Sequence, residues 1–215
     1  MNEICTRFAC GNLTLEGKLG LPEGKGPFPA VVICHPHPLY GGSMDNNVVY
    51  GIYCALIEAS ISSFRFNFRG VGGSEGTYDK GNGEQQDVYS AIDFIAARNE
   101  IDPDRIGLVG YSAGSGYSLL PGISDNRVKS IVAVSPPLTI FDFTPLRDCP
   151  KPKLIISGGK DEHIPIDRFT EFCRSISQPS KHYIIDSADH FWWGNESRLG
   201  ERVVGYFLDI FENRK

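Results

Sequence analysis

The sequence lacks several features that mark membrane, secreted or nucleic-acid-binding proteins. No stretch approaches the roughly 20 consecutive apolar residues that a membrane-spanning helix requires. The N-terminus carries Asn2, Glu3 and Arg7 where a signal peptide has its apolar core. The 21 lysines and arginines are scattered, the net charge is -5, and no basic run suits a phosphate backbone. We therefore expect a cytoplasmic protein with no nucleic-acid or membrane partner.

Patterns of metal ligands are also missing. The cysteines form no Cys-x-x-Cys pair and have no histidine at ligand spacing, and the His35-x-His37 pair has no third ligand nearby. We therefore expect no metal and no cofactor. Buried free thiols are the favoured interpretation of the cysteines, although a structural Cys5–Cys10 bridge stays open as an alternative. Four cysteines lie within apolar patterns, namely Cys10, Cys34, Cys54 and Cys173.

The 215 residues have the composition of one globular domain. A chain of this length lies below the ~250 residues at which hydrophobic cores tend to split. No repeat, low-complexity tract or linker marks a boundary, so we expect one domain over residues 1–215. The oligomeric state, monomer or homodimer, is left open.

Short apolar runs alternate with segments of helical periodicity along the chain. An N-terminal hairpin is expected from residues 4–9 and 13–21, joined by a turn at Gly11-Asn12. The alternation that follows predicts a three-layer α/β/α sandwich, in which helices cover both faces of a mostly parallel, twisted sheet. Further strands are expected at residues 30–34, 63–68, 106–111, 129–135, 154–157 and 183–185, and helices around residues 48–56, 88–95, 169–176 and 203–211.

A candidate nucleophile follows one of these strands, at the sheet edge where the chemistry of parallel sheets collects. The segment 110–114 reads Gly-Tyr-Ser-Ala-Gly and lies between an apolar strand and the start of a small-residue helix. The flanking glycines leave room for neighbouring backbone beside a sharp turn. An ordinary turn with a buried serine is the alternative, but this context favours Ser112 as a nucleophile.

A serine hydroxyl needs a base within hydrogen-bond reach and an acid that orients the base. Among the five histidines, only His190 combines a strand-end position with the chain order serine, acid, histidine. Asp161 follows an apolar run and a Gly-Gly turn, which places it at the same sheet edge, and it is the preferred acid. The alternatives are that Asp161 caps a helix, or that Asp186 or Asp189, in the loop of His190, is the orienting acid.

Acyl transfer also requires hydrogen-bond donors for the oxyanion that develops on the carbonyl oxygen. One donor is usually the backbone N–H after the nucleophile, here that of Ala113. The second is expected in the loop after strand 30–34, where two prolines have no N–H to donate. His37 is the first candidate in that loop, and Leu39 or Tyr40 comes next.

The chain resembles the α/β-hydrolase superfamily over essentially its whole length. The segment 110–114 resembles the nucleophile elbow, and Arg69-Gly70-Val71-Gly72-Gly73-Ser74 is similar to a turn common after the fourth strand of that superfamily. Segments 35–46 (HPHPLYGGSMDN) and 66–70 (FNFRG) resemble more specifically a subgroup of small, lidless hydrolases related to dienelactone hydrolases.

This resemblance implies a serine hydrolase without a cofactor. It implies Ser112 as nucleophile, Asp161 as acid and His190 as base, with Ala113 and His37 as oxyanion donors. The usual His-Gly dipeptide after the third strand is His35-Pro36 here, which leaves the register of the second donor open.

The expected substrate is a small-molecule carboxylic ester with a short to medium acyl chain. The segment between strands 129–135 and 154–157 is too short for the lid domain of larger relatives, so an open site is expected. A thioesterase, a lactone hydrolase, a peptidase or a non-catalytic binding protein are the alternatives. Phe141 is expected in the core. The expected pocket residues are Tyr40, Met44, Leu138, Phe191, Trp192 and Trp193.

Overall fold

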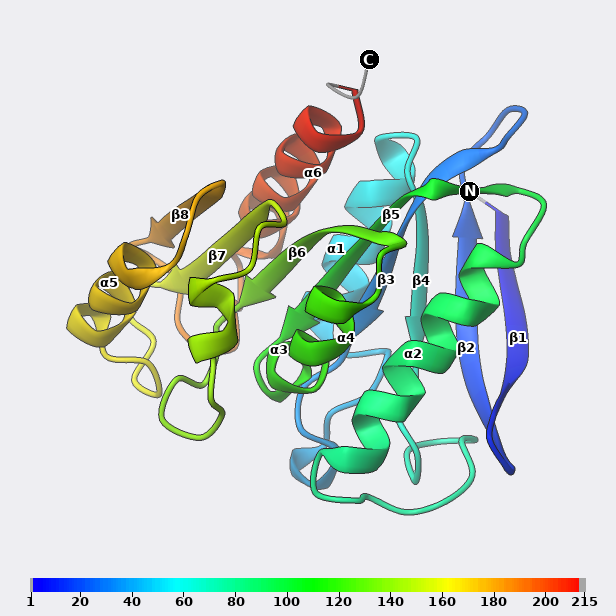
Figure 1. The fold of residues 1–215 in the computed structure, drawn as a ribbon, viewed down its shortest axis with the longest axis horizontal. Helices are drawn as coiled ribbons and strands as arrows, with labels where there is room; N and C mark the ends of the chain where they lie inside the picture. Colours follow the sequence, from blue (N-terminus) through cyan, green and yellow to red (C-terminus); the bar gives the residue numbers. More distant parts are fainter. Residues whose placement is uncertain (1, 213–215) are drawn as a thin grey trace.

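The computed structural model describes residues 2–212 and contains one eight-stranded sheet (Figure 1). The strand order is β1-β2-β4-β3-β5-β6-β7-β8. The first two strands form an antiparallel hairpin, β2 also pairs antiparallel with β4, and the remaining pairs are parallel. The strands are β1 (Asn2–Cys10), β2 (Leu13–Leu21), β3 (Phe28–Cys34), β4 (Ser62–Phe66), β5 (Ile101–Tyr111), β6 (Val128–Val134), β7 (Lys153–Gly158) and β8 (Ser180–Ile185).

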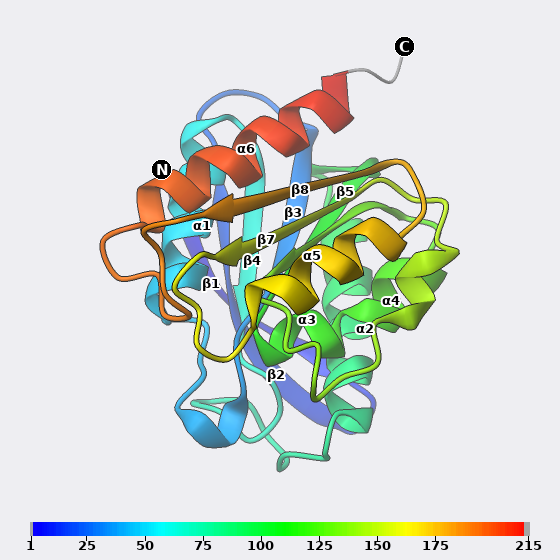
Figure 2. The same cartoon turned by 90° about the vertical axis from the view of Figure 1, so that its left-hand side faces the viewer.

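Helices cover both faces of the sheet, as the two ribbon views show (Figures 1 and 2). One face carries α1 (Asn47–Glu58) and the C-terminal α6 (Glu196–Glu212), which pack on each other. The other face carries α2 (Asn82–Ala96), α3 (Ala113–Tyr117), α4 (Leu119–Ser124) and α5 (Ile166–Ser175). The predicted three-layer sandwich with an N-terminal hairpin is confirmed.

The central strands have apolar residues on both faces because both faces are covered. In β3, Val31 and Ile33 pack against the α1 and α6 side, whereas Ala30 and Val32 pack against the α2 to α5 side. All four side chains are fully buried. This alternation follows from the two-residue period of a strand, and it explains why residues 30–34 form an unbroken apolar run.

The cysteines are free thiols, so the alternative of a Cys5–Cys10 bridge is wrong. The two residues lie five positions apart on β1, where an odd spacing directs side chains to opposite faces. Cys5 is exposed, whereas Cys10 is buried and its thiol donates to Asp87 Oδ1 at 3.2 Å. Asp87 also forms an ion pair with Arg69, at 2.7 Å.

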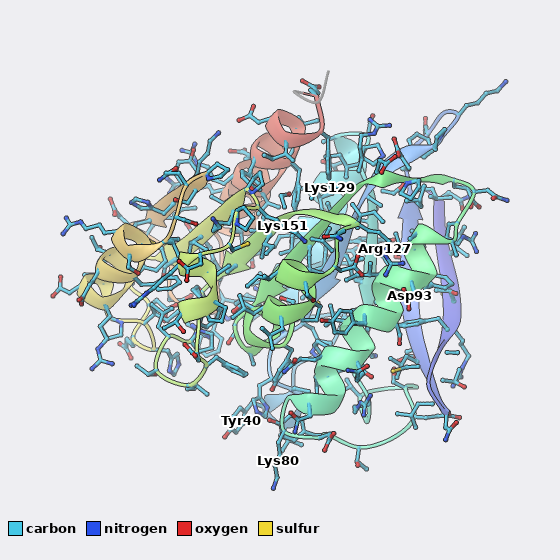
Figure 3. All side chains as sticks on the ribbon, in the orientation of Figure 1. Tyr40, Lys80, Asp93, Arg127, Lys129 and Lys151 are labelled. Carbon is cyan, nitrogen blue, oxygen red and sulfur yellow. The ribbon has the colours of Figure 1, made fainter. Side chains whose placement is uncertain are left out.

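The connection between β6 and β7 contains only one short 3-10 turn, Thr144–Arg147, so no lid domain is inserted there. Within residues 2–212, no helix combines the length and apolar character needed to cross a bilayer. Because β3, β5, β6 and β7 pair in parallel, their carboxyl ends lie at the same end of the sheet. Figure 3 places Tyr40, from the loop after β3, at this end, while Lys129 at the start of β6 lies toward the other end.

Candidate active site

Ser112 lies in the tight turn between β5 and α3, and its backbone is strained. Its φ of 51° and ψ of -125° lie where a residue with a side chain is rarely found. Neighbouring groups hold the turn: the Ser112 N–H donates to Val134 O at 2.9 Å, and Ser115 Oγ donates to Ser112 O at 2.6 Å. The turn therefore fixes the serine at the carboxyl edge of the sheet.

The glycines on either side of Ser112 are required by close backbone approaches. A Cβ at Gly110 would lie 2.3 Å from Ser115 Cα, and one at Gly114 would lie 2.4 Å from Cys34 O. Both distances are shorter than real Cβ contacts, and the opposing atoms belong to the backbone. The two glycines therefore allow β5, α3 and the end of β3 to meet behind the serine, as the Gly-x-Ser-x-Gly pattern predicts.

The structure brings Ser112, His190 and Asp161 into one chain of hydrogen bonds. His190 Nε2 lies 3.1 Å from Ser112 Oγ, and His190 Nδ1 lies 2.8 Å from Asp161 Oδ2. The Asp161 side chain is buried, and its Oδ1 accepts from the N–H groups of His163 and Ile164 at 3.0 and 3.2 Å. Since a carboxylate only accepts, Nδ1 carries the imidazole proton and Nε2 is free to accept from the serine.

The loop that carries His190 is anchored on both sides of that residue. Tyr111 Oη donates to His190 O at 2.8 Å, and Trp192 Nε1 donates to Ser135 Oγ at 3.1 Å. Asp189 Oδ1 accepts from the Trp192 N–H at 2.8 Å. Asp189, which the sequence left open as the orienting acid, thus stabilises its own loop, while Asp161 contacts the imidazole.

The loop after β3 carries His37, which lines the same cavity as Ser112, and the hydrogen bonds of this loop differ among the three candidate oxyanion donors. The Leu39 N–H donates to His37 Nδ1 at 3.2 Å, and the Tyr40 N–H donates to His37 O at 3.1 Å. Those two amides are therefore engaged within the loop, which favours His37 as the second donor. Ala113 is the first residue of α3, where an amide has no acceptor in its own helix.

A cavity of about 520 Å³ opens onto Ser112 and His190 and is lined mainly by apolar and aromatic side chains. Tyr40 and Phe191 line it, as expected from the sequence. Phe141, expected in the core, also lines it, because its ring packs over Gly116, where a Cβ would lie 2.4 Å from the ring. Among residues 2–212, no acidic side chain lines this cavity.

The expectation for four other pocket residues needs correction. Met44 is buried beside Asn67, which holds its backbone N–H at 2.7 Å, and lies outside this lining. Leu138 packs against the core and faces a separate hollow beside α5. Trp192 has a φ of 64°, and its indole is fully buried in the core between the sheet and α6. Trp193 is 67% exposed and lies outside the cavity lining.

His163 and Ile140 also line the cavity, and neither was expected there from the sequence. The His163 ring lies edge-on to the His190 ring, with centroids 4.7 Å apart. Its position two residues after Asp161 is the one hint that the sequence offers. Within residues 2–212, no group of three or more histidine, cysteine, aspartate or glutamate side chains converges to hold a metal ion.

The fold and this arrangement of serine, histidine and aspartate are those of an α/β serine hydrolase. The family model for X-Pro dipeptidyl-peptidase (S15 family) matches residues 12–148. The chain belongs to this family, which is one of the α/β-hydrolase families.

Several individual proteins are similar over most of the chain. An α/β serine hydrolase homologue from Coxiella burnetii is 33% identical, with a TM-score of 0.85, and the match covers 95% of this chain and 97% of that one. A lidless serine hydrolase from Xanthomonas campestris is 26% identical, with a TM-score of 0.86 and coverages of 98% and 95%. An uncharacterised protein from Rickettsia prowazekii is 32% identical over 86% of this chain and 81% of its own length.

Proposed function

We propose that this protein is a serine carboxylesterase that cleaves esters of short to medium acyl chain through an acyl-enzyme on Ser112. One observation carries the proposal. Ser112 Oγ lies 3.1 Å from His190 Nε2, and His190 Nδ1 lies 2.8 Å from Asp161 Oδ2, at the base of an open apolar cavity. This order of groups provides a nucleophile, a base and an orienting acid within hydrogen-bond distance of one another.

In the first half of the reaction, Ser112 Oγ bonds to the ester carbonyl carbon while His190 Nε2 accepts its proton. The carbonyl oxygen becomes an oxyanion that accepts hydrogen bonds from the N–H groups of Ala113 and His37. The carbon–oxygen bond to the alcohol then breaks, and His190 returns the proton to the leaving alkoxide. Asp161 stabilises the imidazolium between the two steps and remains ionised.

In the second half, water attacks the acyl-enzyme with His190 again as the base. The same two N–H groups stabilise the second oxyanion, and the products are the carboxylic acid and free Ser112. Each donor contributes about 3 kcal/mol to lowering the barrier. The loop that presents His37 is therefore as much a part of the proposed catalyst as the serine.

The cavity favours an uncharged acyl group. Tyr40, Ile140 and Phe191 line it and remain 87%, 76% and 53% exposed, so they offer apolar surface that an acyl chain would cover. A dipeptidyl peptidase must bind the ammonium group of a peptide N-terminus, and an ammonium in an apolar site needs a counter-charge. No acidic side chain lines the cavity, which favours ester over dipeptide substrates.

The test is hydrolysis of p-nitrophenyl esters with two to twelve acyl carbons. We expect turnover to be highest for short and medium chains, and Ser112→Ala and His190→Ala to lower kcat at least 1,000-fold. Asp161→Asn should lower kcat strongly, whereas Asp189→Asn, the matched change in the neighbouring loop, should retain most activity. Unchanged turnover in Ser112→Ala, or equal losses in the two aspartate variants, would contradict the proposal.

A further inference from the structure

The segments 35–46 and 66–70, which are far apart in the sequence, contact each other through polar groups. Met44 is held by both of its backbone groups: its N–H donates to Asn67 Oδ1 at 2.7 Å, and its carbonyl accepts from Arg65 Nη1 at 3.0 Å. Arg65 is in β4 and Asn67 lies just beyond its end, two residues apart, so their side chains leave the chain on the same face. Two residues at the end of β4 therefore fix the C-terminal end of the loop after β3.

The same stretch of chain fixes the beginning of the loop through His35. The Phe68 N–H donates to His35 Nε2 at 3.1 Å, so the imidazole proton is on Nδ1. Nδ1 lies 2.6 Å from Pro36 O and donates to it. Burial lowers the pKa of His35 to about 4, which keeps this neutral donor form near pH 7.

These contacts determine where the His37 N–H points. Carbonyl and N–H point in opposite directions across a trans peptide, so holding Pro36 O directs the His37 N–H away from His35. The other side of His37 is fixed as well, because its carbonyl accepts from the Gly42 N–H at 3.1 Å. Gly42 is two residues from Met44. Both ends of the loop and the peptide between them are thus connected to β4 and its extension.

The side chains that hold Met44 are themselves immobilised. The Arg65 guanidinium is buried, donates to Glu3 Oε2 at 3.1 Å and to Asp45, and lies 5.0 and 4.7 Å from the ring centroids of Tyr50 and Tyr53. Burial alone would raise the pKa of the Glu3 and Asp45 carboxyl groups, but the hydrogen bonds from Arg65 lower each pKa below its ordinary value. Both groups are therefore ionised. The guanidinium is consequently paired without any substrate.

Asn67 is oriented by a carboxylate. Its Nδ2 donates to Glu16 Oε1 at 2.6 Å, which leaves Oδ1 directed toward the Met44 N–H. Glu16 is fixed in turn by the Gly73 N–H at 2.7 Å. The amide cannot turn without placing its oxygen against this carboxylate.

We propose that Arg65 and Asn67 are positioning residues for the oxyanion hole, which they organise by holding Met44 and hence the loop 35–46 that presents the His37 N–H. The proposal rests on the esterase function proposed above. Neither side chain belongs to the cavity lining, so their effect on the reaction is exerted through the loop. This proposal also gives the motifs HPHPLYGGSMDN and FNFRG a shared role, since the first forms the loop and the second contains Asn67, which holds it.

The test compares Asn67→Ala with a matched control, Ser177→Ala. The control also removes a side chain with two hydrogen bonds, to Cys149 O and Lys153 Nζ, at the opposite end of the sheet. We expect Asn67→Ala to lower kcat 10- to 100-fold with less than a threefold change in KM. Its affinity for phenylboronic acid, which forms a tetrahedral adduct with a serine, should fall by the same factor as kcat/KM.

Arg65→Lys provides a second variant that keeps the positive charge beside Glu3 and Asp45. It should fold, lower kcat less than Asn67→Ala does, and leave the pH profile of kcat unchanged, because the base is still His190. If Asn67→Ala retains kcat within threefold, or loses no more than Ser177→Ala at equal thermal stability, the positioning role is wrong. A rise in KM at unchanged kcat would also overturn it.

Hydrogen–deuterium exchange separates this proposal from the proposed function. Amides in residues 35–46 should exchange at least tenfold faster in Asn67→Ala than in the wild type, and Ser177→Ala should leave them unchanged. If the wild type cleaves no ester, the esterase function is wrong, and this measurement still tests whether Asn67 holds the loop 35–46 in place. If exchange in residues 35–46 is unchanged in Asn67→Ala, then Asn67 does not hold this loop in place.

Discussion

Gly42 lies where a side chain would collide with the peptide that leads into His37. A Cβ there would be 2.1 Å from Pro36 O and 2.7 Å from His37 O, although the backbone of Gly42 avoids the positive φ values that exclude alanine. Gly42→Ala should therefore displace the His37 N–H, the proposed second oxyanion donor, and lower kcat about 10- to 100-fold, with little change in KM. Steady-state kinetics on p-nitrophenyl butyrate checks this.

Gly205→Ala is the control for Gly42→Ala. A Cβ at Gly205 has no neighbour within 4 Å, and helical alanine is favoured over glycine by roughly 0.5–1 kcal/mol. It should therefore raise stability and leave kcat unchanged. Equal kinetics for the two variants would show that the close approach at Gly42 has no effect on the reaction.

His35 should make the stability of the protein depend on pH. Burial lowers its pKa from 6.5 to about 4 in the folded protein, so the unfolded chain binds the proton more readily. The contribution of His35 to the free energy of unfolding is therefore full above pH 6.5 and is lost as the pH falls toward 4, by about 2 kcal/mol between pH 7 and 5.

Urea unfolding at pH 7 and pH 5 tests this contribution. His35→Gln should reduce the difference between the two pH values by about 2 kcal/mol. The same change at exposed His182 should leave the difference as it is in the wild type. A difference unaffected by His35→Gln would mean that another group is responsible.

The residues proposed for catalysis could be located from the sequence because each follows a strand. Periodicity identified the strands, and the rules for parallel sheets placed their ends at one edge, which left Ser112, Asp161 and His190 together. The orientation of pocket side chains was less accessible. Phe141 and Leu138 lie in irregular chain, where no period tells which way a side chain points, and contacts distant in sequence decide it.

Trp192 illustrates the same limit among secondary-structure elements. Aromatic residues beside a candidate base suggest a pocket, but a φ of 64° turns this indole into the core between the sheet and α6. Its partner Ser135 lies at the end of β6, 57 residues away in the sequence. No local pattern encodes a contact at that separation.

The loop after β8 should hold His190 less firmly when the hydrogen bond between Trp192 and Ser135 is removed. Trp192→Phe removes the hydrogen bond from Nε1 to Ser135 Oγ and part of the buried ring, at a cost of about 1–3 kcal/mol in unfolding free energy. We expect kcat to fall because His190 is held less firmly against Ser112. Thermal unfolding and steady-state kinetics, measured together, check the two effects.

A double-mutant cycle with Ser135→Ala isolates the hydrogen bond from the loss of ring volume. The coupling energy should be about 1 kcal/mol. The fold-loss in kcat of the double variant should be smaller than the product of the fold-losses of the two single variants. Additive effects on both quantities would indicate that the Trp192–Ser135 contact does not hold the loop.

Several exposed apolar side chains, including Ile140 and Phe191, line the cavity of the candidate site. Ile140 both lines the cavity and is 76% exposed, whereas Ile184 is an exposed isoleucine on the edge strand β8, outside the cavity lining. Ile140→Ser should lower kcat/KM about three- to tenfold for octanoyl esters and leave acetyl esters unchanged, since only the longer chain covers this side chain.

Ile184→Ser is the matched control and should change neither value. Activity on the ester series from two to eight acyl carbons provides the measurement. A uniform loss for all chain lengths in Ile140→Ser would indicate damage to the site instead of lost contact with the acyl chain.

Covalent labelling provides the decisive test that Ser112 is a nucleophile activated by His190. The protein is treated with a fluorophosphonate and analysed by intact mass, followed by peptide mapping of the modified residue. We expect one adduct per chain on Ser112 in the wild type, none in Ser112→Ala, and labelling at least 100-fold slower in His190→Ala. Absence of an adduct on Ser112, or equal labelling rates with and without His190, would contradict this role of Ser112.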